Sequence, residues 1–254
     1  MPIQLQRHGR AATLVLDRPP LNILDLETLS LLDGAIAEAA AMPEITVLFL
    51  RGVVGSRGFS AGVAVEDHVP ERVNAMLAGL HGAIRRLRAL PAVTVAAVHG
   101  HCLGGGMELA LSCDLVLASD DARFAQPEID LGCFPPVGAA LYPALLGPAR
   151  ALDLLLSGRS LGAAELEAMG LVARRVPAGC LDEAIVGLAA ELAGKSTPVV
   201  RLIKQAVRAG RELPFPAALA ESERLYVEQL CHTADMQEGI AAFLAKRPPE
   251  WRHS

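Results

Sequence analysis

The sequence of 254 residues has few aromatic residues and no excess of positive charge. Phe, Trp and Tyr make up 4% of it, with a single Trp, so platforms for stacking single-stranded nucleic acid are poorly supplied. Asp and Glu outnumber Lys and Arg by 28 to 23, which gives a formal net charge of −5. Phosphate binding needs a concentrated positive field, so this composition argues against nucleic acid as the main partner.

Long apolar runs are also missing. No window reaches the roughly 18 uninterrupted apolar residues that a membrane-spanning helix requires. The first seven residues, MPIQLQR, have no apolar run behind their positive charge and do not resemble a signal peptide. Because 52% of the residues are apolar, a large buried core can form. We therefore expect a soluble, cytoplasmic, globular protein.

Several cofactor and metal motifs are absent. The five cysteines include no C-x-x-C pair, and we expect reduced thiols. The nearest approach to a metal site is His99, His101 and Cys102, whose spacing lacks the paired ligands of a zinc centre. The glycine triplet at 104–106 does not continue into G-x-G-x-x-G, and no Walker A motif occurs. We expect no metal and no cofactor.

Apolar strands alternate with helical patterns along the first half of the chain. The residue patterns predict strands at 3–6, 12–16, 45–50, 93–98, 115–118 and 123–125. They predict helices at 25–41, 70–90 and 105–112. This alternation indicates an α/β fold with parallel strand pairing.

Helices dominate after Pro135. Pro148 and Gly158 are expected to bound one helix, and Ser160 is expected to cap the next, over 163–169. An amphipathic helix is predicted at 181–193, a helix capped by Ser196 or Thr197 follows, and one long helix is predicted over 216–245. We find no linker and expect a core over 1–195 with a helical region over 196–254.

Two glycine-bearing turns each follow a predicted buried strand, where α/β proteins place their ligands. They are Gly58-Phe59-Ser60-Ala61-Gly62 and Gly104-Gly105-Gly106. Glycine permits close backbone approach and leaves peptide N–H groups free to donate, so the two turns together could form an oxyanion hole. The spacing alone fits ordinary turns better.

Two glutamates follow these turns. Glu108 lies among apolar neighbours on the predicted short helix, which favours desolvation and a raised pKa. Glu128 comes just after the predicted strand at 123–125. On spacing alone, a satisfied helix carboxylate and a surface carboxylate explain them better than a catalytic pair.

Taken together, these segments resemble the crotonase, or enoyl-CoA hydratase/isomerase, superfamily. Residues 59–63 (FSAGV) are similar to the F-x-A-G-x segment of that family. Residues 101–114 (HCLGGGMELALSCD) are similar to its second oxyanion turn and catalytic helix, and residues 124–132 (FAQPEIDLG) to the segment that carries its second glutamate. The likeness extends over nearly the whole chain.

The resemblance implies a spiral of repeated β-β-α units, and assembly as a homotrimer or a dimer of trimers. It implies that the backbone N–H groups of Ala61 and Gly105 bind the oxygen of an acyl-CoA thioester. It also implies that Glu108 and Glu128 act as the acid–base pair that adds or removes water across an α,β double bond. Coenzyme A would then be part of the substrate.

The resemblance also implies a set of substrate-binding residues: Ser60, Gly62, Val63, Gly104, Phe134, Pro135 and Pro136. Two segments depart from the common family pattern. Ala64 stands where many relatives carry Asp, with Glu66-Asp67 near a position often held by Lys. Residues 132–137 (GCFPPV) replace the commoner G-x-x-P-G-x, and this variant looks like the branch of cyclic dienoyl-CoA hydratases. A short branched acyl group, as in 3-methylglutaconyl-CoA, is also compatible.

Two other functions stay open at this point. One is a different crotonase reaction, namely double-bond isomerisation, decarboxylation or thioester hydrolysis. The other is a non-catalytic oligomeric or RNA-binding protein, for which only the stretch Arg85-Arg86-Leu87-Arg88 speaks. Two glutamates favour hydration over isomerisation, since isomerases of this family often keep only one.

Overall fold

Two β-sheets form the body of the protein in this computed structural model, which describes residues 1–254. The strands are β1 (Ile3–His8), β2 (Ala11–Leu16), β3 (Val47–Gly52), β4 (Gly58–Ser60), β5 (Val93–Val98), β6 (His101–Leu103), β7 (Leu115–Ser119), β8 (Arg123–Ala125), β9 (Leu161–Gly162) and β10 (Arg174–Val176). The helices are α1 (Leu26–Ala40), α2 (Val73–Ala89), α3 (Gly105–Leu111), α4 (Pro136–Leu146), α5 (Pro148–Ser157), α6 (Ala163–Ala168), α7 (Leu181–Ala193), α8 (Thr197–Glu212), α9 (Phe215–Glu228) and α10 (Ala234–Leu244). Three short 3-10 helices, η1 (Val65–His68), η2 (Pro127–Leu131) and η3 (Leu230–His232), complete the set.

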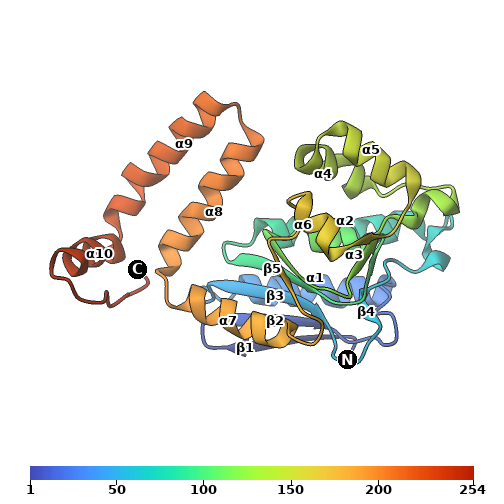
Figure 1. Cartoon of the computed structure of the whole chain (residues 1–254), viewed down its shortest axis with the longest axis horizontal. Coiled ribbons are helices and arrows are strands. Elements are labelled where there is room, and N and C mark those ends of the chain that lie inside the picture. The colour runs from blue at the N-terminus through green and yellow to red at the C-terminus, as the bar shows by residue number, and fades with distance from the viewer.

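The chain winds through the two sheets as a spiral. The larger sheet has the order β1-β2-β3-β5-β7-β10, and only its β1–β2 pair is antiparallel. The smaller sheet has the order β4-β6-β8-β9, with β4, β6 and β8 parallel. From β3 to β8, each turn adds one strand to each sheet before a helix follows, as the resemblance implies, whereas the first turn places both β1 and β2 in the larger sheet (Figure 1).

This winding stacks corresponding segments of successive turns. The residues after β4, β6 and β8 leave the smaller sheet at the same edge, since these strands run parallel. The Gly104 N–H donates to the Ala125 carbonyl oxygen at 2.9 Å, which ties the second turn to the third. The candidate segments of the sequence thus meet at one place although they lie about 20 to 40 residues apart.

The strands of the larger sheet are buried on both faces, as their continuous apolar runs predict. Leu48 and Leu50 of β3 belong to a core cluster of 40 buried residues that includes α1 and α2. Val47 and Phe49 point to the opposite face, where a cluster of 9 buried residues includes apolar side chains of α7. The two faces together hold the sheet rigid beneath the candidate site.

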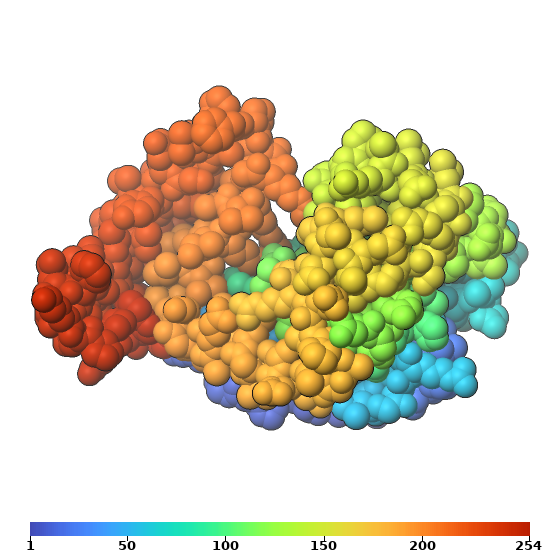
Figure 2. Space-filling model, in the orientation of Figure 1, coloured from blue at the N-terminus to red at the C-terminus, as the bar shows by residue number.

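The last three helices extend from the body as an arm. Figure 1 shows α8 and α9 side by side, with α10 beyond them and away from the smaller sheet. Figure 2 shows a hollow between this arm and the segments around α4 to α6. Ser196 caps α8, so the expected boundary at residue 196 coincides with the start of the arm. That 196–254 is a separate domain stays a prediction.

Two details of the expected helices were wrong. The helix expected over 216–245 is two helices, α9 and α10, separated by η3, because Thr233 caps a new helix by accepting a hydrogen bond from Met236 N at 3.2 Å. Ser160 does not cap α6, because the segment before that helix forms β9 and Gly162 is the N-cap residue. No helix is long and apolar enough to cross a membrane.

Candidate active site

Glu108 projects from a helix that is buried along its whole length. All seven residues of α3 are buried, and Glu108 itself is 2% exposed. Its Oε1 accepts a hydrogen bond from the Gly138 N–H at 2.8 Å, in the first turn of α4. A carboxylate in this setting has a fixed position and little contact with water.

The pKa of Glu108 is raised to about 7, first by burial and also by the nearby charge of Glu128, against the lowering effect of the backbone N–H groups of Gly138 and Val137. Burial also raises the pKa of Glu128. Two neighbouring carboxyl groups repel each other when both are ionised, so this arrangement favours a state in which one holds a proton while the other is ionised. Such a pair can donate and accept protons at the same time.

Glu128 lies against the second glycine turn. It belongs to η2, and its Oε1 would lie 2.7 Å from a Cβ atom placed on Gly104. Gly104 also has a φ of +53°, which side-chain-bearing residues rarely adopt. Only glycine therefore lets the start of α3 approach this carboxylate. The structure brings Gly104, Glu108 and Glu128 together, as their motifs suggest.

A buried amide and a buried phenol hold Glu128 in place. With its amide oriented to match its neighbours, Gln126 Nε2 donates to Glu128 Oε2 at 3.0 Å and to the Gly104 carbonyl oxygen at 3.3 Å. The Gln126 oxygen then accepts a hydrogen bond from the hydroxyl of Tyr142 on α4. Both side chains are fully buried. Sequence reasoning did not identify Gln126 or Tyr142, because nothing in the spacing shows that they meet.

The expected donor role of Ala61 is wrong. Its N–H donates to the Leu21 carbonyl oxygen at 2.9 Å and is not free to bind a ligand. Val63, two residues later, has an N–H with no acceptor in the chain, since its neighbours Gly62 and Ala64 make the backbone bonds to Leu24. Gly105, the first residue of α3, lies beside it: a Cβ on Gly105 would be 3.6 Å from the Val63 nitrogen.

The glycines of the two turns permit this close approach. A Cβ on Gly62 would lie 3.2 Å from the Gly105 nitrogen, and Gly62 has a φ of +96°. The Val63 and Gly105 N–H groups thus come from two consecutive turns of the spiral and lie next to each other. They form the pair of donors that the sequence suggests, with Val63 in the place given to Ala61.

Ser60 does not face a ligand. Its hydroxyl is buried, donates to the Asn22 carbonyl oxygen at 2.7 Å and accepts from the Gly62 N–H at 3.1 Å. Asn22 in turn donates from its amide to the Gly58 carbonyl oxygen at 2.9 Å. Ser60 and Asn22 therefore shape the first turn, and Ser60, which is fully buried, is not accessible for the substrate-binding role expected of it.

The segment 132–137 joins Glu128 to α4. Pro136 is the first residue of α4, and Pro135 packs close to Gly138, the donor to Glu108. Phe134 is 66% exposed, so in the single chain it does not line an enclosed acyl pocket. The prolines thus fix the start of the helix whose N–H binds Glu108.

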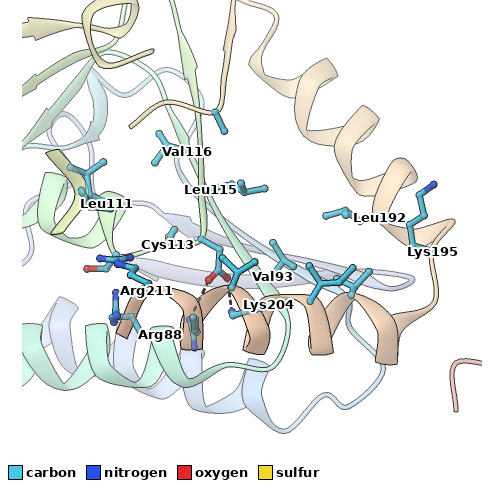
Figure 3. Close-up of a pocket in the computed structure, with 18 of the residues that line it drawn as sticks. Arg88, Val93, Leu111, Cys113, Leu115, Val116, Leu192, Lys195, Lys204 and Arg211 are labelled. Atoms are coloured by element: carbon cyan, nitrogen blue, oxygen red, sulfur yellow. Dashed lines mark hydrogen bonds and ion pairs between the residues drawn. The ribbon is translucent and has the colours of Figure 1, made fainter. Parts of the chain in front are cut away.

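Another cavity lies away from these groups. It encloses about 710 Å³ between α8 and the body and is lined by neither Glu108 nor Glu128 (Figure 3). At its floor Lys204 Nζ lies 2.5 Å from Asp114 Oδ2 and donates to the Ala92 carbonyl oxygen at 2.6 Å. This ion pair between the buried Lys204 and the exposed Asp114 connects α8 to the body.

A spiral of parallel strands that places the buried Glu108, the half-buried Glu128 and two free peptide N–H groups on neighbouring turns is the arrangement expected of an enzyme of the crotonase fold. The family described as enoyl-CoA hydratase/isomerase matches residues 7–254. The chain belongs to this family.

Similar proteins cover the chain almost completely. A probable enoyl-CoA hydratase of Rhizobium meliloti is 36% identical over 252 residues, which cover 98% of this chain and 97% of that protein. The cyclohexa-1,5-dienecarbonyl-CoA hydratase of Thauera aromatica is 36% identical over 260 residues, which cover 99% and 96%. A crystal structure of an enoyl-CoA hydratase subunit from Geobacillus kaustophilus superposes with a TM-score of 0.92 at 33% identity and covers 100% of this chain and 99% of that one.

Proposed function

We propose that the protein adds water to, or removes it from, the α,β double bond of an enoyl-CoA thioester. The observation that supports this proposal is that Glu108 lies near Glu128, Glu128 lies against Gly104, and the free N–H group of Val63 lies beside Gly105. The similar proteins support it, because those named above are described as hydratases of CoA thioesters.

The two peptide N–H groups would act on the thioester oxygen. Attack of water at Cβ moves electrons through Cα to that oxygen, which becomes an enolate. Donors already fixed by the fold stabilise this charge without reorganising, and one such donor contributes about 3 kcal/mol. Because Val63 and Gly105 lie on separate turns, the rigid sheets set the spacing between them.

The two carboxyl groups would manage the protons. In hydration, the ionised member takes a proton as the water oxygen bonds to Cβ, and the protonated member gives its proton to Cα. The pair ends with the same number of protons as at the start, so no external acid or base is required. Dehydration is the same sequence reversed.

A cavity of about 360 Å³ next to Ala64 is a place for part of coenzyme A. It begins one residue beyond Val63 and is lined by Arg18 and Arg72, which can meet phosphate groups. Three acids, Asp25, Glu66 and Asp67, line it as well, and Asp25 pairs with Arg18. Arg72 Nε pairs with Asp67 Oδ1 at 3.0 Å, so Asp67 offsets part of this positive charge. The departure of residues 64–67 from the family pattern therefore falls within the proposed CoA site.

The test is turnover of purified protein on straight-chain, branched and cyclic enoyl-CoA thioesters, followed by mass spectrometry for a gain or loss of one water. We expect Glu108→Gln and Glu128→Gln each to lower kcat by about 100-fold or more, with thioester binding retained. Glu223→Gln, an exposed glutamate on α9, is the matched control and should keep full activity.

Two results would contradict the proposal. Full activity in both the Glu108→Gln and the Glu128→Gln variant would show that these two carboxyl groups are not the acid–base pair. Conversion of an enoyl-CoA without uptake of ¹⁸O from labelled water would show isomerisation in place of hydration.

A further inference from the structure

A second cavity, of about 370 Å³, adjoins the proposed active site. Its apolar lining comes from Ile84 of α2 and from Pro136, Val137 and Leu141 around the start of α4. Val137 precedes Gly138, whose N–H binds Glu108. The cavity therefore lies just past the catalytic carboxyl group, between α2 and α4.

Two buried polar atoms on the cavity lining have no hydrogen-bond partner. They are Ser112 Oγ and His81 Nε2, which make up half of the four such side-chain atoms in the whole chain. Ser112 is 2% exposed. A buried polar group without a partner costs free energy, and native proteins supply a partner for nearly all of them. Two of them on one cavity point to a polar group of a ligand.

The position of Ser112 places that group on the acyl chain. Ser112 follows Glu108 by four residues at the end of α3, so both side chains lie on one helix face about 6 Å apart along the axis. An extended acyl chain with about three carbons beyond the double bond covers that distance. A group at the end of such a chain would reach Ser112 while the double bond lies at Glu108.

The charge around the cavity is positive. Arg85 and Arg88 line it, and Arg88 also lines the larger cavity, where Arg211 lies near it (Figure 3). The nearby acids are Glu108, which lies next to the cavity, Asp114, which pairs with Lys204, and Glu212, whose Oε1 lies 3.6 Å from Arg88 Nη2. Arg85 makes no ion pair, whereas Arg86, its neighbour, pairs with Asp33 on α1.

We propose that this cavity selects an enoyl-CoA whose acyl chain ends in a carboxylate, which Arg85, Ser112 and His81 bind. The carboxylate supplies acceptors for the Ser112 hydroxyl, the imidazole N–H and the guanidinium group. The proposal rests on the proposed function, because it assigns the far end of the same substrate. It leaves the reacting groups unchanged and concerns specificity alone.

The experiment compares two matched substrates, trans-2-hexenoyl-CoA and the same six-carbon enoyl-CoA with a terminal carboxylate. We expect the native protein to show a kcat/KM about tenfold or more higher for the carboxylate substrate. Arg85→Gln should abolish this preference through a rise in KM for the carboxylate substrate only, and Arg85→Lys should restore part of it. Arg86→Gln, the matched control, should keep the preference. Ser112→Ala should weaken it several-fold.

Binding of the saturated thioesters, adipyl-CoA and hexanoyl-CoA, measured by calorimetry, separates the two proposals. Tighter binding of adipyl-CoA that depends on Arg85, in a protein that hydrates neither enoyl-CoA, would keep the carboxylate site and overturn the hydratase function. Hydration of hexenoyl-CoA with equal or greater efficiency would keep the hydratase function and overturn the carboxylate site. An equal fall in kcat/KM for both substrates in Arg85→Gln would also overturn the carboxylate site.

Discussion

Ionisation of the buried Glu108 costs the folded protein free energy. Its pKa of about 7 in the folded state lies above the ordinary value near 4.5, so between these limits the folded state binds more protons than the unfolded state. The contribution of this group to stability therefore falls as pH rises from about 4.5 to 7. Replacement by glutamine removes the ionisation.

We accordingly expect Glu108→Gln to be more stable than the native protein above pH 7. Its free energy of unfolding should be higher by up to about 3 kcal/mol. The difference should disappear near pH 4, where both states bind the proton. Urea unfolding at several pH values measures it, with Glu223→Gln as the control that shows no such trend. A constant difference at all pH values would contradict the raised pKa.

At the residue scale, the sequence predicted the members of the site that motifs carry. Gly104, Gly105, Glu108 and Glu128 meet as their segments suggest. It assigned the wrong N–H in the first turn, because spacing does not show that Ala61 is already bonded to Leu21. It could not show the Gln126–Tyr142 bond either, since this depends on where the fold places α4 relative to the segment after β8.

Helix α8 depends on one buried cation. Lys204 is 5% exposed in its side chain, burial lowers its pKa, and it is held by Asp114 and by the Ala92 carbonyl oxygen. Lys204→Met would leave the Asp114 charge with less compensation and the Ala92 oxygen without its donor. We expect a loss of about 3 kcal/mol in the free energy of unfolding.

Denaturant unfolding followed by circular dichroism measures this loss. Lys195→Met, an exposed lysine just before α8, is the matched control and should change stability by less than about 0.5 kcal/mol. Equal stability of the native protein and Lys204→Met would show that apolar contacts alone fasten α8.

At the scale of elements, the length of a strand or helix determines whether its residue pattern predicts it. Long buried strands such as β3 and β5 appear as apolar runs, and the helix at 148–157 is bounded by its proline and glycine. Strands β4 and β6 have three residues each and carry no periodicity of their own. The residue patterns did not predict them, and the second sheet followed only from the family resemblance.

The arm carries large apolar side chains that the single chain leaves in solvent. Phe215, Phe243 and Leu244 are each more than three-quarters exposed. Surfaces of this kind mark interfaces in stable oligomers. Together with the family resemblance, they lead us to expect a homotrimer or a dimer of trimers.

Light scattering after gel filtration tests the whole assembly. The native protein should have three or six times the mass of one chain, and the double variant Phe243→Ser/Leu244→Ser should shift toward the monomer. Val54→Ser, an equally exposed position in the loop after β3, is the control that should keep the native mass. A native protein that runs as a monomer would contradict the expected assembly.

The spiral also determines the order in which the parts of the site are synthesised. A ribosome releases the turns in sequence, so Val63 emerges before Gly105 and Glu108, and Glu128 emerges later still. The N–H of Gly138, which fixes Glu108, comes last of all. A nascent chain can therefore form the pair of peptide donors before its acid–base pair exists, and the four groups first come together when more than half of the protein has been synthesised.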